Sequence, residues 1–184
     1  MQKQIILILF SLIIFYSCKS TQSSSISEKA VNVLIEEKQF EITSDWAFPL
    51  NTNALNQVAN SLLARQGGYG NRFNLIGNAN YIRFDQDTIS GYLPFFGEQR
   101  IGGGSYGRNG QIEFEDVPTD LQITKLPKKN KYELSFRIND KNRPSENYQI
   151  RMNIFFNKRT NISISSSHRT VISYTGNIER VEDE

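Results

Sequence analysis

The clearest pattern in the chain is a strict alternation of apolar and polar residues, which is typical of β-strands that pack one face against a core. The pattern is found at residues 81–93, 111–115, 121–126, 132–138, 148–156, 162–164 and 172–174. Residues 81–93 predict a hairpin with its tip at residues 85–88. The connections between strands are short, so we expect antiparallel pairing, because parallel strands need long crossovers.

Helical spacing is confined to the N-terminal part of the chain. Apolar residues recur every three or four positions between Ala30 and Ile35 and predict a short amphipathic helix that ends near Glu37. Ser25 and Glu28 match the S-x-x-E capping box, which satisfies the first amides of a helix. This match predicts that the helix begins just after Ser25.

A strand and a second helix are expected next. Large apolar residues occupy even positions in the segment that follows: Phe40, Ile42, Trp46 and Phe48. This spacing predicts a strand with these side chains on one face, and Pro49 ends it. Residues 53–65 carry their leucines on one helical face, and Gly67-Gly68 supplies a stop. The pattern leaves open whether this second helix belongs to the core fold.

These elements together predict a β-rich α+β fold in a single domain. The expected architecture is a curled antiparallel sheet, either a sandwich or a partial barrel, with one or two helices on its N-terminal side. No internal repeat of fixed period is present in the sequence.

Residues 1–17 have the composition of a signal peptide. One lysine is the only charge ahead of Cys18, and residues 5–16 are apolar apart from one serine. That run is too short to cross about 30 Å of hydrocarbon as a helix. Ser17-Cys18 resembles a bacterial lipobox, in which the cysteine is acylated, although the two residues before Ser17 are bulkier than usual. An ordinary secretory peptide cut elsewhere and an uncleaved anchor are the alternatives.

Lipidation of Cys18 would hold the protein on a membrane. Each buried methylene contributes about 0.8 kcal/mol, so two or more acyl chains are enough. Residues 18–27 then form a Ser-rich tether, and residues 28–184 form the folded domain. No acidic run follows Cys18, which favours the periplasmic face of the outer membrane, with the cell surface as the alternative.

Composition excludes several classes of function. The chain has 184 residues, one Cys and one His, too few for a Cys/His zinc site or an intramolecular disulfide. Lys and Arg number 21 against 19 Asp and Glu, so the net charge of +2 offers no field for a nucleic-acid backbone. We expect no cofactor and no nucleic-acid partner.

Two motifs suggest nucleotide binding or catalysis, but their sequence surroundings favour a connecting loop and a surface turn. Gly102, Gly104 and Gly107 satisfy G-x-G-x-x-G, yet a strand follows them instead of the helix that would face a pyrophosphate. A flexible connection is therefore favoured. His168 lies among serines but has no orienting acid near it in the sequence, so a surface turn residue is favoured over a hydrolase.

Carboxylates are the remaining catalytic candidates. Glu113 and Glu115 share one side of a predicted strand, as a glycosidase or a Ca²⁺ site would require. Their alternation with apolar residues favours a solvated face instead.

An aromatic cluster around Pro94 is the candidate binding region. Proline stops the strand ladder there, and packing of the cluster against the core is favoured over exposure. An exposed cluster would form a patch for a ligand or partner. The candidate binding surface consists of Tyr92, Phe95, Phe96, Tyr106 and Arg169.

Three motifs resemble the domain-of-unknown-function 4251 family. The core motif D-x-I-x-x-YLPFFG runs from Asp87 to Gly97, the early strand carries A-x-P at Ala47, and the end motif R-x-x-I-S-Y-x-G begins at Arg169. The resemblance covers residues 28–178. His168 replaces the usual Asn, and residues 52–72 are longer than is common. The resemblance implies a Bacteroidota-type envelope protein, in most cases a lipoprotein, and no assigned activity.

The expected function is that of a lipid-anchored cell-envelope accessory protein, non-catalytic, that binds a partner. The membrane is one expected partner, through acyl chains on Cys18, and an envelope protein or a glycan is the other. A β-barrel carrier of an apolar small molecule is the alternative, and a carboxylate-dependent hydrolase is less favoured.

Overall fold

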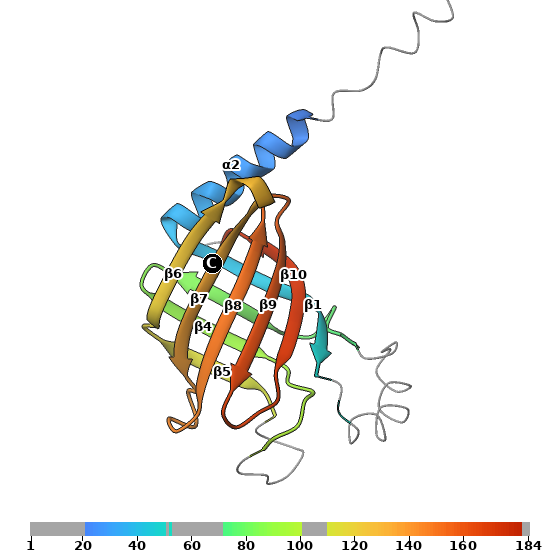
Figure 1. Ribbon diagram of the computed structural model, residues 1–184, viewed down its shortest axis with the longest axis vertical. Coiled ribbons are helices and arrows are strands. Elements are labelled where there is room, and N and C mark those ends of the chain that lie inside the picture. The colour runs from blue at the N-terminus through green and yellow to red at the C-terminus, as the bar shows by residue number, and fades with distance from the viewer. Residues whose placement is uncertain (1–20, 51, 53–71, 101–109, 182–184) are drawn as a thin grey trace, which may run out of the picture.

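The computed structural model describes residues 21–50, 52, 72–100 and 110–181 (Figure 1). Helix α2 spans Thr21–Glu37. The strands are β1 (Gln39–Pro49), β2 (Phe73–Asn74), β3 (Tyr81–Asp85), β4 (Thr88–Leu93), β5 (Ile112–Asp116), β6 (Thr119–Leu126), β7 (Lys131–Asn139), β8 (Asn147–Phe155), β9 (Arg159–Ser166) and β10 (Ile172–Glu179). Each strand expected from the alternating pattern is therefore present, with the predicted hairpin tip between β3 and β4.

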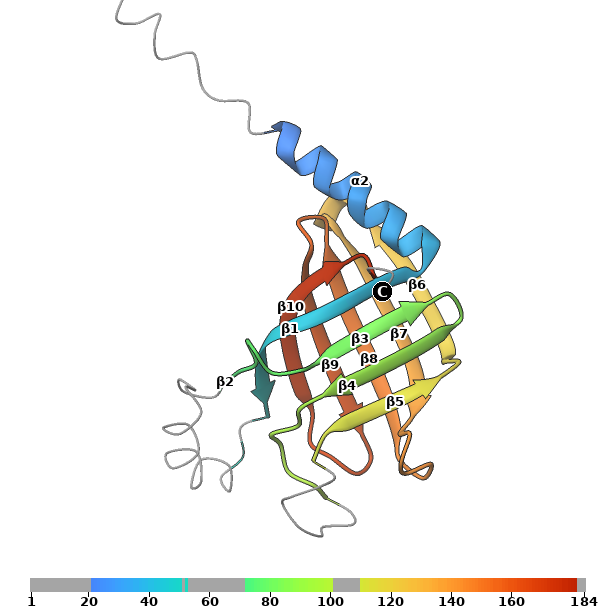
Figure 2. The ribbon, with the colours of Figure 1, turned by 180° about the vertical axis from the view of Figure 1, so that it is seen from behind.

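The strands form one antiparallel sheet that folds back on itself. Its order is β5-β4-β3-β1-β10-β9-β8-β7-β6, with β2 paired to β1. Strands β3–β5 cross behind β6–β10, which makes a two-layered half-barrel (Figures 1 and 2). The β1–β10 pair joins the layers on one side. On the other side the chain passes from β5 to β6 through Pro118, which has no amide hydrogen for a ladder. The predicted antiparallel partial barrel is confirmed.

A β-bulge in β1 reverses the side chains that follow it. The register against β10 shifts between Ser44 and Trp46. Beyond the shift, Ala47 and Pro49 are buried. Trp46 and Phe48, which the even spacing grouped with the core residues, are instead half-buried on the outer face. The expected face is wrong because one extra residue moves every later side chain to the other side of the strand.

Asn80 and Gly176 accommodate the bulge. The Asn80 side chain accepts a hydrogen bond from the Ser44 amide at 2.8 Å and donates to the Ser44 carbonyl at 3.0 Å. It therefore replaces a strand partner for buried backbone groups. A Cβ atom at Gly176 would lie 2.0 Å from the carbonyl oxygen of Thr43, so this position requires glycine.

Helix α2 lies at one end of the sheet (Figures 1 and 2). Val31, Leu34 and Ile35 are its buried residues, as the spacing predicted. The helix begins at Thr21, so Ser25 lies inside it and the predicted capping box is wrong. Residues 21–27, expected to belong to the Ser-rich tether, are helical too. No helix in the described part of the chain is long and apolar enough to cross a membrane.

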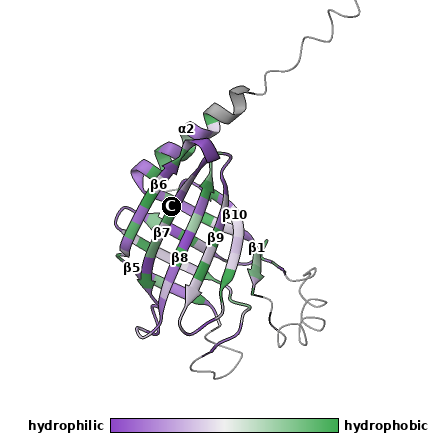
Figure 3. Ribbon diagram, in the orientation of Figure 1, coloured by the Kyte–Doolittle hydropathy of each residue, from purple (hydrophilic) through white to green (hydrophobic). Residues whose placement is uncertain are grey.

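Aromatic rings occupy the space between the two layers. Phe40 and Phe84 stack with centroids 4.4 Å apart, and Phe84 meets Phe136 of the opposite layer edge-on at 5.9 Å. Phe114 packs against Tyr148 at 6.3 Å. Each such pair contributes about 0.5–1.5 kcal/mol beyond its buried area. The alternation of apolar and polar residues along the strands is visible as bands of colour (Figure 3).

Three predicted features lie outside the described residues. They are the leader with Cys18, the helix at residues 53–65 and the glycine motif at residues 102–107.

Candidate functional site

Arg169 is the centre of a buried charge cluster, at the end of the sheet opposite α2. It lies in the β9–β10 connection, and its side chain is 2% exposed. Its Nε donates to Glu146 Oε1 at 2.8 Å, and its Nη2 donates to Glu146 Oε2 at 3.4 Å. Nη1 donates to the carbonyl of Gly110 at 3.2 Å, and Nη2 lies 3.8 Å from Asp140 Oδ2. The guanidinium therefore joins three separate segments of the chain.

The two carboxylates of this cluster come from the β7–β8 connection and are satisfied by protein donors. Glu146 also accepts a hydrogen bond from the Ser166 hydroxyl at 2.8 Å. Asp140 accepts two backbone amides from its own loop through Oδ1, at 2.8 and 2.7 Å. The Tyr148 hydroxyl donates to its other oxygen. We call Arg169, Glu146, Asp140 and Tyr148 the Arg169 cluster.

A second arginine at the edge of the Arg169 cluster balances its two negative charges. Arg143 Nη2 lies 3.7 Å from Glu146 Oε2, so two guanidinium groups face two carboxylates. Glu146 is fully buried and Asp140 is 4% exposed. A buried charge that loses its partner costs several kcal/mol, so this cluster couples the loops to one another.

Two buried tyrosines complete the surroundings of the cluster. Burial, reinforced by the hydrogen bond to Asp140, raises the pKa of the Tyr148 phenol above its usual value. Burial also raises the pKa of Tyr174, whose hydroxyl donates to the carbonyl of Pro94 at 2.8 Å. Both phenols therefore remain protonated donors at neutral pH, which suits a structural role better than that of a base or nucleophile.

The aromatic cluster around Pro94 packs next to the Arg169 cluster. The Phe95 ring lies over the Arg169 guanidinium, with the central carbon 5.0 Å from the ring centroid, a cation–π contact. Phe96 stacks on Phe73 of β2 with centroids 4.1 Å apart and ring planes within 2°. Both phenylalanines are partly buried against the core.

The segment that follows the aromatic cluster and the end motif form one structural unit. Thr170 and Glu98 exchange hydrogen bonds, from the Thr170 amide to the Glu98 carbonyl and from the Glu98 amide to Thr170 Oγ1, each 3.0 Å long. The Arg100 amide donates to the His168 carbonyl at 2.7 Å. A Cβ atom at Gly97 would lie 2.5 Å from Thr170 Oγ1. Glycine therefore permits the close approach of two motifs that are far apart in sequence.

The structure separates the residues of the predicted binding surface. Tyr92 is half-buried on β4, while Phe95 and Phe96 pack beside the cluster. Arg169 is buried and therefore does not belong to an exposed surface. Tyr106 lies outside the described residues.

Sequence reasoning missed the acidic members of the cluster. Asp140 continues the even, inward positions of β7, and Glu146 precedes Tyr148 on the even, inward positions of β8. Each could have been recognised as an acidic residue at a position where the alternation places side chains on the inward face. A charge is buried there only with a partner.

The other catalytic candidates do not converge. Ser167 Oγ lies 2.8 Å from Nδ1 of the adjacent His168, a local contact in an exposed turn. Glu113 and Glu115 share the outer face of β5, where Lys141 Nζ lies 3.9 Å and 2.7 Å from their carboxylates. The hydrogen bond to Glu115 raises the pKa of Lys141. Within the described ranges, no group of three or more His, Cys, Asp or Glu could hold a metal ion.

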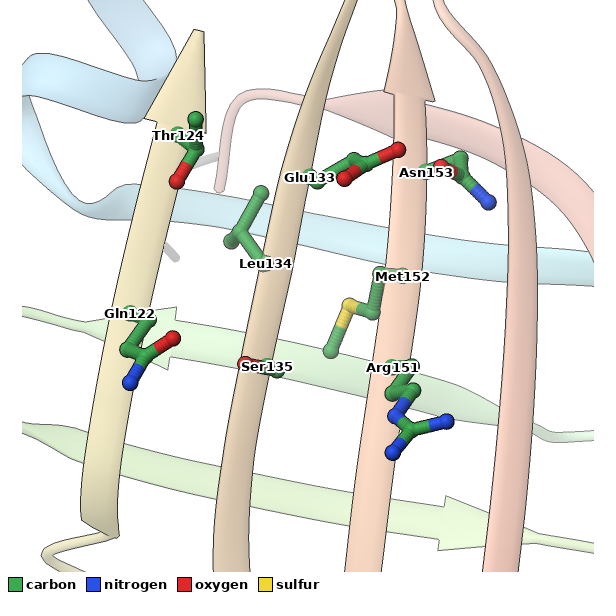
Figure 4. A pocket seen from close by; sticks show the side chains of 8 residues that line it. All are labelled: Gln122, Thr124, Glu133, Leu134, Ser135, Arg151, Met152 and Asn153. Atoms are coloured by element: carbon green, nitrogen blue, oxygen red, sulfur yellow. The ribbon is translucent and has the colours of Figure 1, made fainter.

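A polar hollow lies on the outer face of β6, β7 and β8 (Figure 4). Its volume is about 320 Å³. The residues that line it are Gln122, Thr124, Glu133, Leu134, Ser135, Arg151, Met152 and Asn153. Leu134 and Met152 belong to the buried face of their strands, so the exposed lining is polar.

The half-barrel sheet, the end helix and the Arg169 cluster define a β-rich α+β protein whose two signature motifs stabilise one end of the fold. The chain belongs to the family described as "Domain of unknown function (DUF4251)", whose model matches residues 22–178. It is similar to the crystal structure of a DUF4251 family protein from Bacteroides eggerthii DSM 20697. The TM-score is 0.55 at 13% identity, over 84% of this chain and 88% of that chain. This likeness shows the fold alone. No curated protein matches the chain.

Proposed function

We propose that this protein is a lipid-anchored accessory protein of the outer membrane, on its periplasmic face, and a non-catalytic binding module. The observation that carries the proposal is the position of α2. The helix begins three residues after Cys18, at the end of the sheet opposite the β7–β8 and β9–β10 connections (Figure 1), which carry the Arg169 cluster. Acyl chains on Cys18 would therefore leave the loop end of the domain facing away from the membrane.

The helical start of the domain would act as a short stalk. Three extended residues span at most about 11 Å, so α2 would begin close to the membrane surface. The part of α2 ahead of Ser27 starts at Thr21 and extends about 9 Å. The side chain of Ile26 is exposed, whereas Ser27 Oγ already donates to the carbonyl of Phe156 at the end of β8. The domain would thus be held at a defined distance from the membrane.

The contacts of the charged residues support binding over catalysis. The buried carboxylates of the Arg169 cluster are occupied by internal donors, and Glu113 and Glu115 are paired with Lys141 on an outer face. An enzyme needs groups that converge on a space for a substrate. A carrier has equally little support, because aromatic rings take up the space between the layers where cargo would lie.

Metabolic labelling with an alkyne analogue of palmitate tests the anchor directly. We expect label on the wild-type protein and none on Cys18→Ala. Ser20→Ala, a neighbouring change that spares the thiol, is the matched control and should be labelled like wild type. Membrane fractionation alone is insufficient, since an uncleaved leader could also hold the Cys18→Ala protein. An unlabelled wild-type protein, or a labelled Cys18→Ala variant, would show that the lipid anchor is wrong.

A further inference from the structure

Two rows of outward-facing side chains cross the sheet from β6 to β1. The strand registers place the first row at Thr124, Glu133, Asn153, Asn161, Thr175 and Trp46. They place the second row at Gln122, Ser135, Arg151, Ser163, Ser173 and Phe48. Neighbouring strands lie about 4.8 Å apart, so each row is about 24 Å long. The rows therefore form a continuous strip that is long enough for a chain-like ligand.

The strip is rich in hydrogen-bonding groups and poor in charge. Eight of its twelve residues carry an amide or a hydroxyl, groups that serve as donors and as acceptors. Its two charges, on Glu133 and Arg151, are opposite, whereas about 25–35% of an ordinary soluble surface is charged. In the part of the chain that the structure describes, the side chains of Asn161 and Ser163 have no hydrogen-bond partner. This chemistry suits an uncharged ligand that is itself polar.

The polar hollow lies at the β6 end of the strip. Figure 4 shows its lining residues on three adjacent strands, and its volume of about 320 Å³ is at the lower limit for small-ligand sites. Glu133 at its rim is already paired with Lys131 at 2.7 Å. One unit of a chain-like ligand could bind in the hollow, with the remaining units along the two rows.

An aromatic pair forms the opposite end of the strip. The β1 bulge turns Trp46 and Phe48 outward, beside Thr175 and Ser173 of β10. The guanidinium carbon of Arg72 lies 4.5 Å from the centroid of the Trp46 ring, a cation–π contact that covers one face of that ring. Bulges often re-aim side chains at functional sites. An aromatic ring beside hydroxyl and amide groups matches a sugar ring, which has an apolar C–H face and a polar rim.

We propose that this strip binds a neutral glycan, with sugar rings stacked on Trp46 and Phe48 and their hydroxyls bonded to the amides and hydroxyls of β8, β9 and β10. The inference rests on the proposed function, because it names the ligand class of the binding module. A protein partner would call for a larger apolar area than these two rings provide. An anionic polymer would call for several basic residues along the strip, and Arg151 is the only basic residue in the two rows.

Affinity electrophoresis of the full-length protein in mild detergent tests the proposal. Gels contain dextran, soluble mannan or laminarin as neutral polymers, alginate as an anionic polymer, or no polymer. We expect at least one neutral polymer to retard the protein. The same polymer should change the fluorescence of Trp46, the only tryptophan in the chain. Retardation by none of the neutral polymers would overturn the proposal, as would retardation by alginate alone.

Variants locate the binding on the strip. The double change Asn161→Ala/Ser163→Ala and the single change Trp46→Ala should each raise the Kd about tenfold, the equivalent of about 1.4 kcal/mol. Ser90→Ala on the outer face of β4 is the matched control and should bind like wild type. Equal retardation of all these variants would place the ligand elsewhere and overturn the proposal. Palmitate labelling is scored separately, so failure of the glycan site is distinguishable from failure of the anchor.

Discussion

Replacement of Arg169 by methionine removes the cation from the Arg169 cluster while keeping much of the side-chain volume. The change deletes two hydrogen bonds to Glu146 and one to the carbonyl of Gly110. Glu146 remains fully buried, with the Ser166 hydroxyl as a donor and Arg143 at 3.7 Å. The variant therefore carries a buried carboxylate that has lost its main partner.

The expected loss follows from that unpaired charge. Breaking a buried ion pair by removing one partner costs about 3–5 kcal/mol, compared with a total free energy of unfolding of about 5–15 kcal/mol. A domain of this size loses about 2–4 °C of Tm per kcal/mol. We therefore expect the Tm of Arg169→Met to fall by roughly 6–20 °C.

Urea denaturation followed by Trp46 fluorescence measures the free energy of unfolding. Arg159→Met is the matched control, because the Arg159 side chain is 64% exposed and lies 3.8 Å from Asp45. Exposed pairs contribute less than about 1 kcal/mol, so this variant should unfold almost like wild type. The double variant Arg169→Met/Glu146→Leu should recover part of the loss, since it removes the unpaired carboxylate as well.

The reasoning is refuted if Arg169→Met costs no more than Arg159→Met. If Arg169→Met does not fold at all, the double variant still decides the matter. A double variant that folds shows that the unpaired charge was responsible, whereas a double variant that is equally unfolded shows that the packing of the guanidinium mattered instead.

Two further predictions concern alkaline pH and the β1 bulge. Burial holds the pKa of Tyr148 and Tyr174 above the unfolded value of about 10, so their contribution to stability is present below that pH and is lost as the pH rises through and beyond it. In absorbance titrations at 295 nm, two tyrosines should ionise only on unfolding, and Tyr148→Phe and Tyr174→Phe should each remove one. Reversible titration of every tyrosine near pH 10 in the folded protein would contradict this. Gly176→Ala places a Cβ 2.0 Å from a backbone carbonyl and should cost about 1–3 kcal/mol in urea denaturation. Gly110→Ala, where nothing lies within 4 Å, should cost far less, and equal losses would argue against a tight bulge.

Strand β1 shows what the periodic pattern can predict and what it cannot. Alternation predicted the strand and the burial of its first half. It could not predict the bulge, because the extra residue is accommodated by the Asn80 side chain and by the missing Cβ of Gly176, which are distant in sequence. The outward aromatic pair of the proposed glycan strip exists only because of that bulge.

The burial of charge in the Arg169 cluster also depended on contacts that the sequence pattern does not predict. The sequence favoured packing of the aromatic cluster around Pro94 but grouped Arg169 with a candidate binding surface. Folding brings the β7–β8 and β9–β10 connections to the same end of the sheet, where Glu146 and Asp140 meet the guanidinium. Each residue taken alone is an ordinary charged loop residue.

The strand series, the antiparallel fold class and the family resemblance could all be predicted from the amino-acid sequence alone. These properties are local, since they depend on period-2 spacing, turn residues and contiguous motifs. The folded arrangement was needed to show that Trp46 faces outward, that Arg169 is buried and that two rows of outward-facing side chains align across six strands. Those properties depend on register and on contacts between distant segments, and side-chain spacing along one strand carries no information about its partner's register.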